Sequence, residues 1–488
     1  MQAPEPNPGI VADLLARASD RESFARWQAQ VRAAGACQQP VRLAGRVDLA
    51  DVSTGELGSA PVLDTDGEPD GILLKACGTR RASRCAPCAE VYRRDAWHLL
   101  AAGLRGGKGV PGAVAAHPRV FVTFTAPSFG PVHSSRTRRG RVQVCHPARR
   151  GARCPHDQPT RCGARHLPGD AALGTPLCPG CYYYARAVVW NALAPELWRR
   201  TTIALGRILA RVAGLSSGAC ARLVSPAYAK VAEYQSRGAI HYHAIIRLDA
   251  PSTPDDLDRV APPPAGFTAA LLVEAVRLAA AEVAVPCPLG GPPLRWGAQL
   301  DLHPIGQAGV DGEPGGEGAV SAERVASYVA KYATKATEGY GAALDRPLRS
   351  RAELNRLDGQ VPAHVEALVR ACWALGGRRE LAGLGLRRWA HMLGYGGHFL
   401  TKSRRYATTF RLLRAARRAW TARRRHGPTV QLDRDGRLLP PEGAVLVAVW
   451  CYQGRGYITH GDAWLAGHLA AQYREMRRVA REELSSVA

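Results

Sequence analysis

The segment from Leu223 to Leu248 constrains the fold most, because its sequence is typical of a β-hairpin. Successive side chains of a strand point to opposite faces, so His241 and His243 share one face and Tyr242 points to the other. Two histidines at this spacing are often ordinary surface residues. A third ligand beside them would indicate a metal site instead.

The turn of the hairpin decides which residue faces His241. A three-residue loop centred on Arg237 places Glu233 opposite His241, whereas a two-residue loop would offer Tyr234. We expect Glu233. Two imidazoles and a carboxylate with open positions suit Mg²⁺ or Mn²⁺ bound together with a phosphate oxygen. Such an ion would polarise a scissile phosphate as a Lewis acid.

A second motif lies in the helix expected over residues 321–336. Tyr328 and Tyr332 are four residues apart, as are Lys331 and Lys335, so each pair lies along one helix face. A phenol is a poor nucleophile unaided, but a metal-activated phosphate and a nearby ammonium reduce that handicap. Its attack on DNA would give a 5′-phosphotyrosyl link and a free 3′-hydroxyl. The alternative is an amphipathic helix whose tyrosines only pack on a core.

Composition indicates a folded DNA-binding protein. The chain has 488 residues, 46% of them apolar, which is typical of two or three domains. A net charge of +24 predicts a polyanionic partner, because basic contacts to phosphates release counterions. No secretory signal or membrane span is expected, since the longest apolar stretch carries Glu274, Arg277 and Glu282. We expect a cytoplasmic protein without a membrane partner.

The cysteines predict structural zinc sites, because thiols in a reducing compartment are more often metal ligands than disulfides. Two CxxC pairs, Cys85 with Cys88 and Cys178 with Cys181, are typical halves of zinc sites. We expect two structural zinc ions, and spacing leaves the assignment of the other ligands open. The further candidates are Cys77, Cys145, Cys154 and Cys162, with His146, His156 and His166 as imidazole options.

An arginine-rich segment, residues 403–425, interleaves basic and aromatic side chains. Arginines suit backbone phosphates, and Tyr406, Phe410 and Trp420 are available for base stacking. The alternative is a solvated charged face. We expect DNA contact through Arg404, Arg405, Arg411, Arg414, Arg417 and Arg418.

The motifs together resemble those of rolling-circle replication initiators of the HUH endonuclease superfamily. The strand 121–127, the His-hydrophobe-His at 241–243 and the Tyr-x-x-x-Tyr-x-x-Lys at 328–335 stand in the order found there. The chain is more closely similar to RepSA-type initiators of actinobacterial plasmids, and the resemblance covers about residues 75–410. The blocks that carry it are 77–81, Cys85-x-x-Cys88, 233–235 and 397–406.

This resemblance implies an α+β fold. Its centre is an antiparallel five-stranded HUH-type sheet flanked by helices, with the histidine strand in the middle. It implies that His241 and His243 bind metal, that Tyr328 or Tyr332 is the nucleophile, and that Thr123 and Thr125 lie beside the histidines. Glu233 as third ligand is our own inference from the hairpin. Some relatives use one tyrosine and a glutamate, and Glu323 and Glu338 flank the helix, so that variant stays open.

We expect three segments: a helical or irregular lead-in (1–75), an endonuclease domain (76–340) with a cysteine-rich zinc insert (about 76–185), and a mainly helical basic region (341–488) for DNA contact. Local periodicity predicts helices and strands along the whole chain. The helices are expected over 186–215, 268–284, 321–336, 411–425 and 462–483, and the strands over 120–125, 294–305 and 445–452.

The function expected from these features is that of a plasmid replication initiator. It would be a metal-dependent nickase and strand transferase that opens plasmid origin DNA, in double- and single-stranded form, for rolling-circle replication. Residues 106–109 lack the hydroxyl and the upstream glycine of a phosphate-binding loop, so a host helicase and polymerase are expected partners. The alternatives are a transposase or relaxase of the same superfamily, or a non-catalytic zinc-stabilised DNA-binding regulator.

Overall fold

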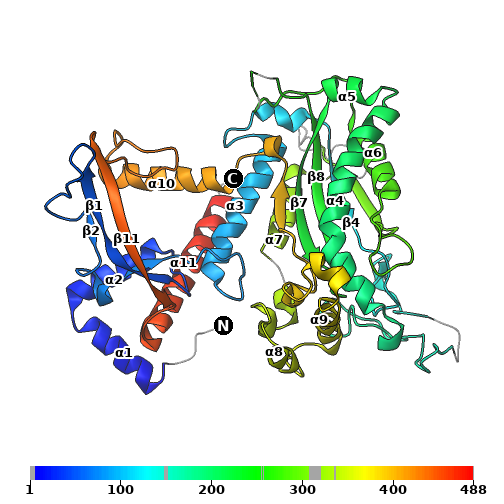
Figure 1. Ribbon diagram of the computed structural model, residues 1–488, viewed down its shortest axis with the longest axis horizontal. Helices are drawn as coiled ribbons and strands as arrows, with labels where there is room; N and C mark the ends of the chain where they lie inside the picture. The colour runs from blue at the N-terminus through cyan, green and yellow to red at the C-terminus, as the bar shows by residue number, and fades with distance from the viewer. Residues whose placement is uncertain are drawn as a thin grey trace. The chain divides into compact units, whose positions relative to one another are not determined.

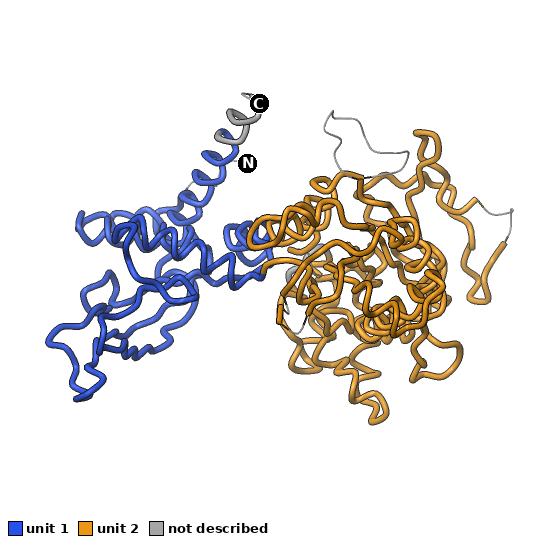
Figure 2. Tube along the Cα trace, turned by 90° about the horizontal axis from the view of Figure 1, so that it is seen from above, with its two compact units in different colours: residues 1–95, 409–488 blue, residues 96–408 orange. Residues whose placement is uncertain are grey.

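The chain folds into two compact units, shown in different colours in Figure 2. The computed structural model describes residues 6–147, 152–253, 255–256, 258–306, 320–334 and 337–486. Unit 1 comprises residues 1–95 and 409–488, and unit 2 comprises residues 96–408. This division differs from the three segments predicted from the sequence. The reason is that strand β1 (Val41–Asp51) pairs along its length with strand β11 (Ala444–Arg455), so the two ends of the chain fold together.

Unit 1 is built on a four-stranded antiparallel sheet in which β1 is the central strand. Gly45 permits the pairing with β11. At its φ of +149°, a Cβ would lie 2.0 Å from the carbonyl oxygen of Val449. The sequence predicted the helical N-terminus and β11, but not β1. The other elements are β2 (Leu63–Asp64), β3 (Leu73–Lys75), α1 (Pro8–Ala18), α2 (Arg21–Ala33), α10 (Phe410–His426) and α11 (His460–Ser486).

Unit 2 contains the expected five-stranded antiparallel sheet, with the histidine strand β8 in the middle. The order is β10-β7-β8-β4-β9. Strand β8 is the third of the five strands, so the histidines lie away from both edges of the sheet. The strands are β4 (Arg119–Phe124), β7 (Ser225–Tyr234), β8 (Ile240–Asp249), β9 (Leu300–Pro304) and β10 (Leu400–Lys402), and a small hairpin is formed by β5 (Thr137–Arg138) and β6 (Arg141–Val142).

One face of this sheet is covered by the main hydrophobic core. Tyr242 and Val122 are fully buried there against helix α4, through residues such as Trp190 and Leu197. Helix α7 lies on the other side of the sheet from α4, as Figure 1 shows. The helices of unit 2 are α4 (Tyr184–Val212), α5 (Ser217–Leu223), α6 (Ala269–Glu282), α7 (Ala322–Tyr332), α8 (Arg351–Asn355) and α9 (Ala363–Leu375).

Helix α3 (Ala86–Arg105) was not predicted, because it begins within the first CxxC pair, inside the segment interpreted as a loop-rich insert. The unit boundary at Asp95 falls within this helix. Among the described residues, no single helix is long and apolar enough to cross a membrane; α4 and α5, which are bent by 99° relative to each other, meet the length and composition criteria only as a pair.

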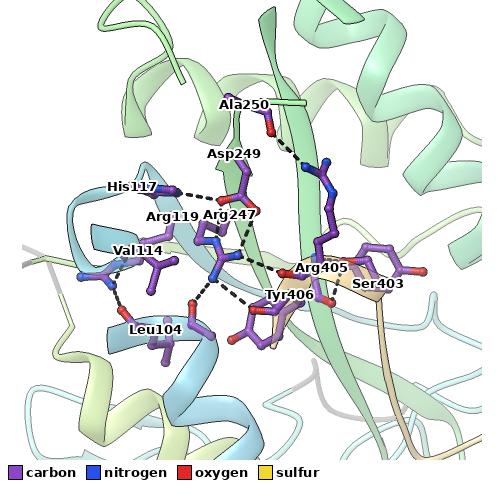
Figure 3. A network of polar contacts seen from close by, with 12 residues as sticks. Leu104, Val114, His117, Arg119, Arg247, Asp249, Ala250, Ser403, Arg405 and Tyr406 are labelled. Atoms are coloured by element: carbon purple, nitrogen blue, oxygen red, sulfur yellow. Dashed lines mark hydrogen bonds and ion pairs between the residues drawn. The ribbon is translucent and has the colours of Figure 1, made fainter. Parts of the chain in front are cut away.

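A buried ion-pair network joins distant segments of unit 2 (Figure 3). Arg247 donates to both carboxylate oxygens of Asp249, at 2.7 and 2.8 Å, and both side chains are fully buried. His117 Nδ1 lies 2.7 Å from Asp249 Oδ1. Arg247 also donates to the carbonyl oxygens of Gly103 and Tyr406. The end of α3 and the segment after β10 are therefore both tied to β8.

Candidate active site

The hairpin of β7 and β8 has the register predicted from its loop. Glu233 pairs with His241 across the two strands. The loop closes with a hydrogen bond from Gln235 N to the carbonyl oxygen of Ala239, at 2.9 Å. Gly238 adopts a φ of +74°, which favours glycine. A three-residue loop therefore sets which side chains face one another.

The three candidate ligands converge on one point. Glu233 Oε2 lies 3.0 Å from His241 Nε2 and 3.1 Å from His243 Nε2. Adjacent ligand atoms of an octahedral ion, each about 2.1 Å from it, are separated by roughly 3.0 Å. The donor set and its spacing therefore fit Mg²⁺ or Mn²⁺, with the other coordination positions open to water or phosphate oxygen.

The electrostatics favour the metal-binding forms of these groups. Burial raises the pKa of Glu233, but hydrogen bonds to His241 and His243 outweigh this effect and lower the pKa to about 2. Burial lowers the pKa of His243. At neutral pH the carboxylate is thus charged and the buried imidazole tends to be neutral, which leaves a lone pair for a cation.

Thr123 on β4 fixes the orientation of His243. The two residues pair in the sheet register, and Thr123 Oγ1 lies 3.1 Å from His243 Nδ1. A hydrogen bond at Nδ1 leaves Nε2 to face the other ligands. Thr125 has a different role, because its hydroxyl donates to the carbonyl oxygen of Gln299. The sequence placed both threonines beside the histidines, but only the structure distinguishes them.

Helix α7 brings both tyrosines to the candidate ligands. The ring centroid of His243 lies 5.2 Å from that of Tyr328 and 5.1 Å from that of Tyr332, and the two tyrosine rings are 4.9 Å apart. Ser321 caps the helix by accepting from the backbone N–H of Arg324. The side chain of Tyr328 is 44% exposed, so it does not serve as a core residue.

The surroundings of the Tyr332 hydroxyl favour its protonated form. Burial, the hydrogen bond with Tyr328 and the negative charge of Glu233 raise the pKa of Tyr332 above its ordinary value. Tyr332 therefore stays protonated unless a nearby cation offsets these effects. Phe121 packs against both His243 and Tyr328, with centroids 6.0 and 5.8 Å away.

The other groups assigned around the helix are only partly described. Lys331 is exposed, and its Nζ lies 6.0 Å from the Tyr332 ring centroid. Lys335 lies outside the described residues, as does the side chain of Glu338. Glu323 forms an ion pair with Arg105 at 2.7 Å, so its carboxylate is already engaged.

Among the described residues, the cysteines form three four-ligand groups, one more than the two zinc sites predicted. The ligand atoms of each group lie within 4.8 Å of one another. The eight predicted cysteines all take part, but Cys37 and His133 were not anticipated and His146 is in none of the groups. The groups are Cys37, Cys77, Cys85 and Cys88; His133, Cys145, Cys162 and His166; and Cys154, His156, Cys178 and Cys181.

Sequence spacing missed the first group because its members are far apart. Strands β1, β2 and β3 lie between Cys37 and Cys77, yet the sulfur of Cys37 accepts from the Cys77 backbone N–H at 3.2 Å. The backbone N–H of Gln38 donates to Cys85 Sγ at 3.3 Å. Hydrogen bonds from Cys37 and Cys88 lower the pKa of Cys85 below that of an ordinary thiol. A thiolate is the form that binds zinc.

The six arginines assigned to DNA contact are divided between the units. Arg404 and Arg405 belong to unit 2, and the other four lie on α10 in unit 1. Several hold intramolecular partners, which a charge run in a sequence cannot reveal. Arg411 pairs with Asp435 at 2.6 Å, Arg417 with Asp95, and Arg404 with Asp258 at 3.2 Å, while Arg418 donates to the Asp435 carbonyl oxygen and Arg405 to that of Ala250.

The exposed end of α10 offers better candidates for DNA contact. Arg423, Arg424 and Arg425 are exposed, and the guanidinium of Arg424 lies 4.7 Å from the Trp420 ring centroid. Trp420 is 60% exposed. An exposed aromatic ring beside arginines is typical of a surface that binds nucleic acid bases and phosphates.

Comparison with known proteins identifies the family of this chain. The family model described as "RepSA: Replication initiator protein, pSAM2" matches residues 23–471. A curated relative, "Replication initiator protein" from Streptomyces ambofaciens, is 42% identical over 488 residues, which cover 98% of this chain and 96% of the relative. No solved structure gives a significant match. The chain therefore belongs to the RepSA family of plasmid replication initiators.

Proposed function

We propose that this initiator nicks plasmid origin DNA with a tyrosine of α7, in the manner of the HUH endonucleases that its motifs resemble. The observation that carries the proposal is the convergence of Tyr328 and Tyr332 on His243, with both ring centroids within 5.2 Å. A DNA-binding protein without chemistry has no need for two phenols beside two imidazoles and a carboxylate.

Glu233, His241 and His243 would hold Mg²⁺ or Mn²⁺, and Zn²⁺ would occupy the cysteine groups. When bound, the divalent ion supplies Lewis-acid polarisation of the scissile phosphate. Thr123 keeps the His243 ring oriented, and Lys331, whose Nζ lies 6.0 Å from the Tyr332 ring centroid, would add positive charge beside that phenol.

The reaction is a transesterification. The hydroxyl oxygen of Tyr328 or Tyr332 forms a bond to phosphorus, and the bond from phosphorus to the 3′ oxygen breaks. The tyrosine loses its proton and the leaving 3′ oxygen gains one, so no net hydrolysis occurs. The 3′-hydroxyl is then available to a host polymerase, and the second tyrosine can take part in the later strand transfer that religates the DNA.

Covalent trapping tests this proposal. The full chain is incubated with Mn²⁺ and a supercoiled plasmid that carries the origin, and protein–DNA adducts are separated in SDS. We expect each of Tyr328→Phe and Tyr332→Phe to reduce the adduct and the double variant to abolish it, with origin binding retained. Tyr183→Phe is the matched control, because Tyr183 is a highly exposed tyrosine (70%) elsewhere in unit 2.

An adduct that persists in the double variant would exclude α7 as the source of the nucleophile. Origin binding without any adduct in the unmodified protein would instead identify a non-catalytic DNA-binding protein. Peptide mapping of the trapped adduct would show which tyrosine carries the 5′ phosphate.

A further inference from the structure

The cysteine-rich insert is built from two interleaved ligand groups. Along the chain, a pair of ligands from one group is followed by a pair from the other. The chain between the first and last ligand of each group therefore contains two ligands of the other group. One group spans residues 133–166 and contains the first ligand pair of the other, which spans residues 154–181, so the folding of the two groups is coupled. Sets of two to three thiols with imidazoles suit tetrahedral Zn²⁺. In chain order the pairs are His133 and Cys145, Cys154 and His156, Cys162 and His166, and Cys178 and Cys181.

This insert packs directly against the tip of the β7–β8 hairpin. Gly174 approaches the tip so closely that a Cβ would lie 2.3 Å from the carbonyl carbon of Ser236. Tyr182, which follows the last ligand Cys181, donates its hydroxyl to the carbonyl oxygen of Arg237 at 3.4 Å. The chain on both sides of the second CxxC pair therefore touches the same loop.

The loop itself is held from several directions. The guanidinium of Arg237 donates to the carbonyl oxygens of Ala126 and Pro127, at 2.7 and 2.8 Å. His364 Nε2 lies 3.0 Å from the Arg237 carbonyl oxygen. From α4, Asn191 donates to the Gly238 carbonyl oxygen at 2.9 Å. Without the insert, the loop would keep these contacts but lose its contacts with Gly174 and Tyr182.

The loop conformation matters because it sets the register of the candidate ligands. Glu233 lies two residues before the loop closes at Gln235, and His241 lies two residues after Ala239. A register slip of one residue would turn a ligand to the other face of the sheet. The position of the loop therefore controls how Glu233 meets His241 and His243.

We propose that the insert is a zinc-dependent clamp on this hairpin. Zn²⁺ at the two interleaved groups folds the insert, and the folded insert holds the tip in the conformation that gathers Glu233, His241 and His243. Zinc therefore governs the affinity of the separate Mg²⁺ or Mn²⁺ site. The inference rests on the proposed function only in assigning a divalent ion to that site.

The test compares two zinc sites in one chain. Zinc is counted by elemental analysis of the full-length protein, and Mn²⁺ affinity is measured by calorimetry without DNA. We expect three zinc ions per chain. The double variant Cys178→Ser, Cys181→Ser should lose both zinc ions of the insert, because the groups interleave, and should bind Mn²⁺ at least about tenfold more weakly.

Cys37→Ser is the matched control. It removes a ligand from the group in unit 1, so it should lose one zinc ion and keep the Mn²⁺ affinity of the unmodified protein. Equal Mn²⁺ affinities in the insert variant and the control would overturn the clamp. Retention of one insert zinc in the double variant would overturn the interleaved folding.

A milder variant separates the clamp from general misfolding. Tyr182→Phe removes one hydroxyl and leaves all zinc ligands in place, so zinc content should not change and the stability should fall by no more than the roughly 0.5–1.5 kcal/mol of one hydrogen bond. We expect a roughly two- to tenfold weaker Mn²⁺ affinity, whereas Tyr183→Phe should have no effect. An unchanged affinity in Tyr182→Phe would contradict the proposal. These measurements contain no DNA, so they are independent of the nicking test. If the unmodified protein formed no adduct but the Mn²⁺ affinities changed as expected, only the proposed function would be rejected.

Discussion

Replacing Thr123 by valine tests how the site holds His243. Valine keeps the shape of threonine but lacks the hydroxyl that lies 3.1 Å from His243 Nδ1. His243 is only 2% exposed, so water cannot replace that partner. An unsatisfied buried donor costs about 1–3 kcal/mol, which is roughly a 5- to 150-fold change in an equilibrium constant. We expect the Mn²⁺ affinity to fall about 10- to 100-fold.

Calorimetric titration with Mn²⁺ measures this change directly, and the adduct yield as a function of Mn²⁺ concentration gives a second readout. Saturating Mn²⁺ should restore most of the adduct, because the substitution weakens ion binding and leaves both tyrosines in place. Thr125→Val is the matched control, since the hydroxyl of Thr125 donates to the backbone carbonyl oxygen of Gln299 and not to a candidate ligand. Equal Mn²⁺ midpoints for the two variants would refute the role of Thr123.

Other consequences concern stability. Asp249→Asn leaves the buried Arg247 without its counter-charge, so we expect a loss of about 3–5 kcal/mol in urea unfolding, and an unchanged midpoint would contradict the network in Figure 3. Burial raises the pKa of Asp249, but hydrogen bonds from His117 and Arg247 lower it overall; its stabilisation is therefore complete above the ordinary carboxyl pKa of about 3.9 and is lost as the pH falls through the lowered value. Acid unfolding followed by circular dichroism should show this loss below about pH 4, and Asp249→Asn should remove part of it. Gly45→Ala should destabilise unit 1 by more than about 1 kcal/mol, because its Cβ would meet the Val449 carbonyl oxygen at 2.0 Å; an unchanged thermal midpoint would show that β1 and β11 do not pair in this register.

The sequence determined the parts of this protein that depend on neighbouring residues. Alternation along a strand placed His241 and His243 on one face and narrowed their partner to Glu233 or Tyr234; the register of the folded hairpin confirmed Glu233. The four-residue spacing of Tyr328 and Tyr332 put both phenols on one helix face. Helices expected over 268–284 and 411–425 occur as α6 and α10, with ends shifted by one or two residues.

Strand β1 shows where local patterns stop being informative. Its alternation is interrupted by Gly45 and by charged residues, and its partner β11 lies about 400 residues later in the chain. The same limit applied to the metal groups. CxxC pairs are visible because two ligands share one turn, but Cys37 and His133 join their groups only when distant segments fold together.

Tertiary structure alone decided three matters: the meeting of α7 with the histidine strand, the sorting of the cysteines into three groups, and the engagement of Arg411 and Arg417 in internal ion pairs. The physical reason is range. Backbone periodicity and turn geometry act over a few residues, so they can be read from the chain in order. Contacts between segments tens or hundreds of residues apart are set by how the sheets and their covering helices pack, and no local pattern encodes that packing.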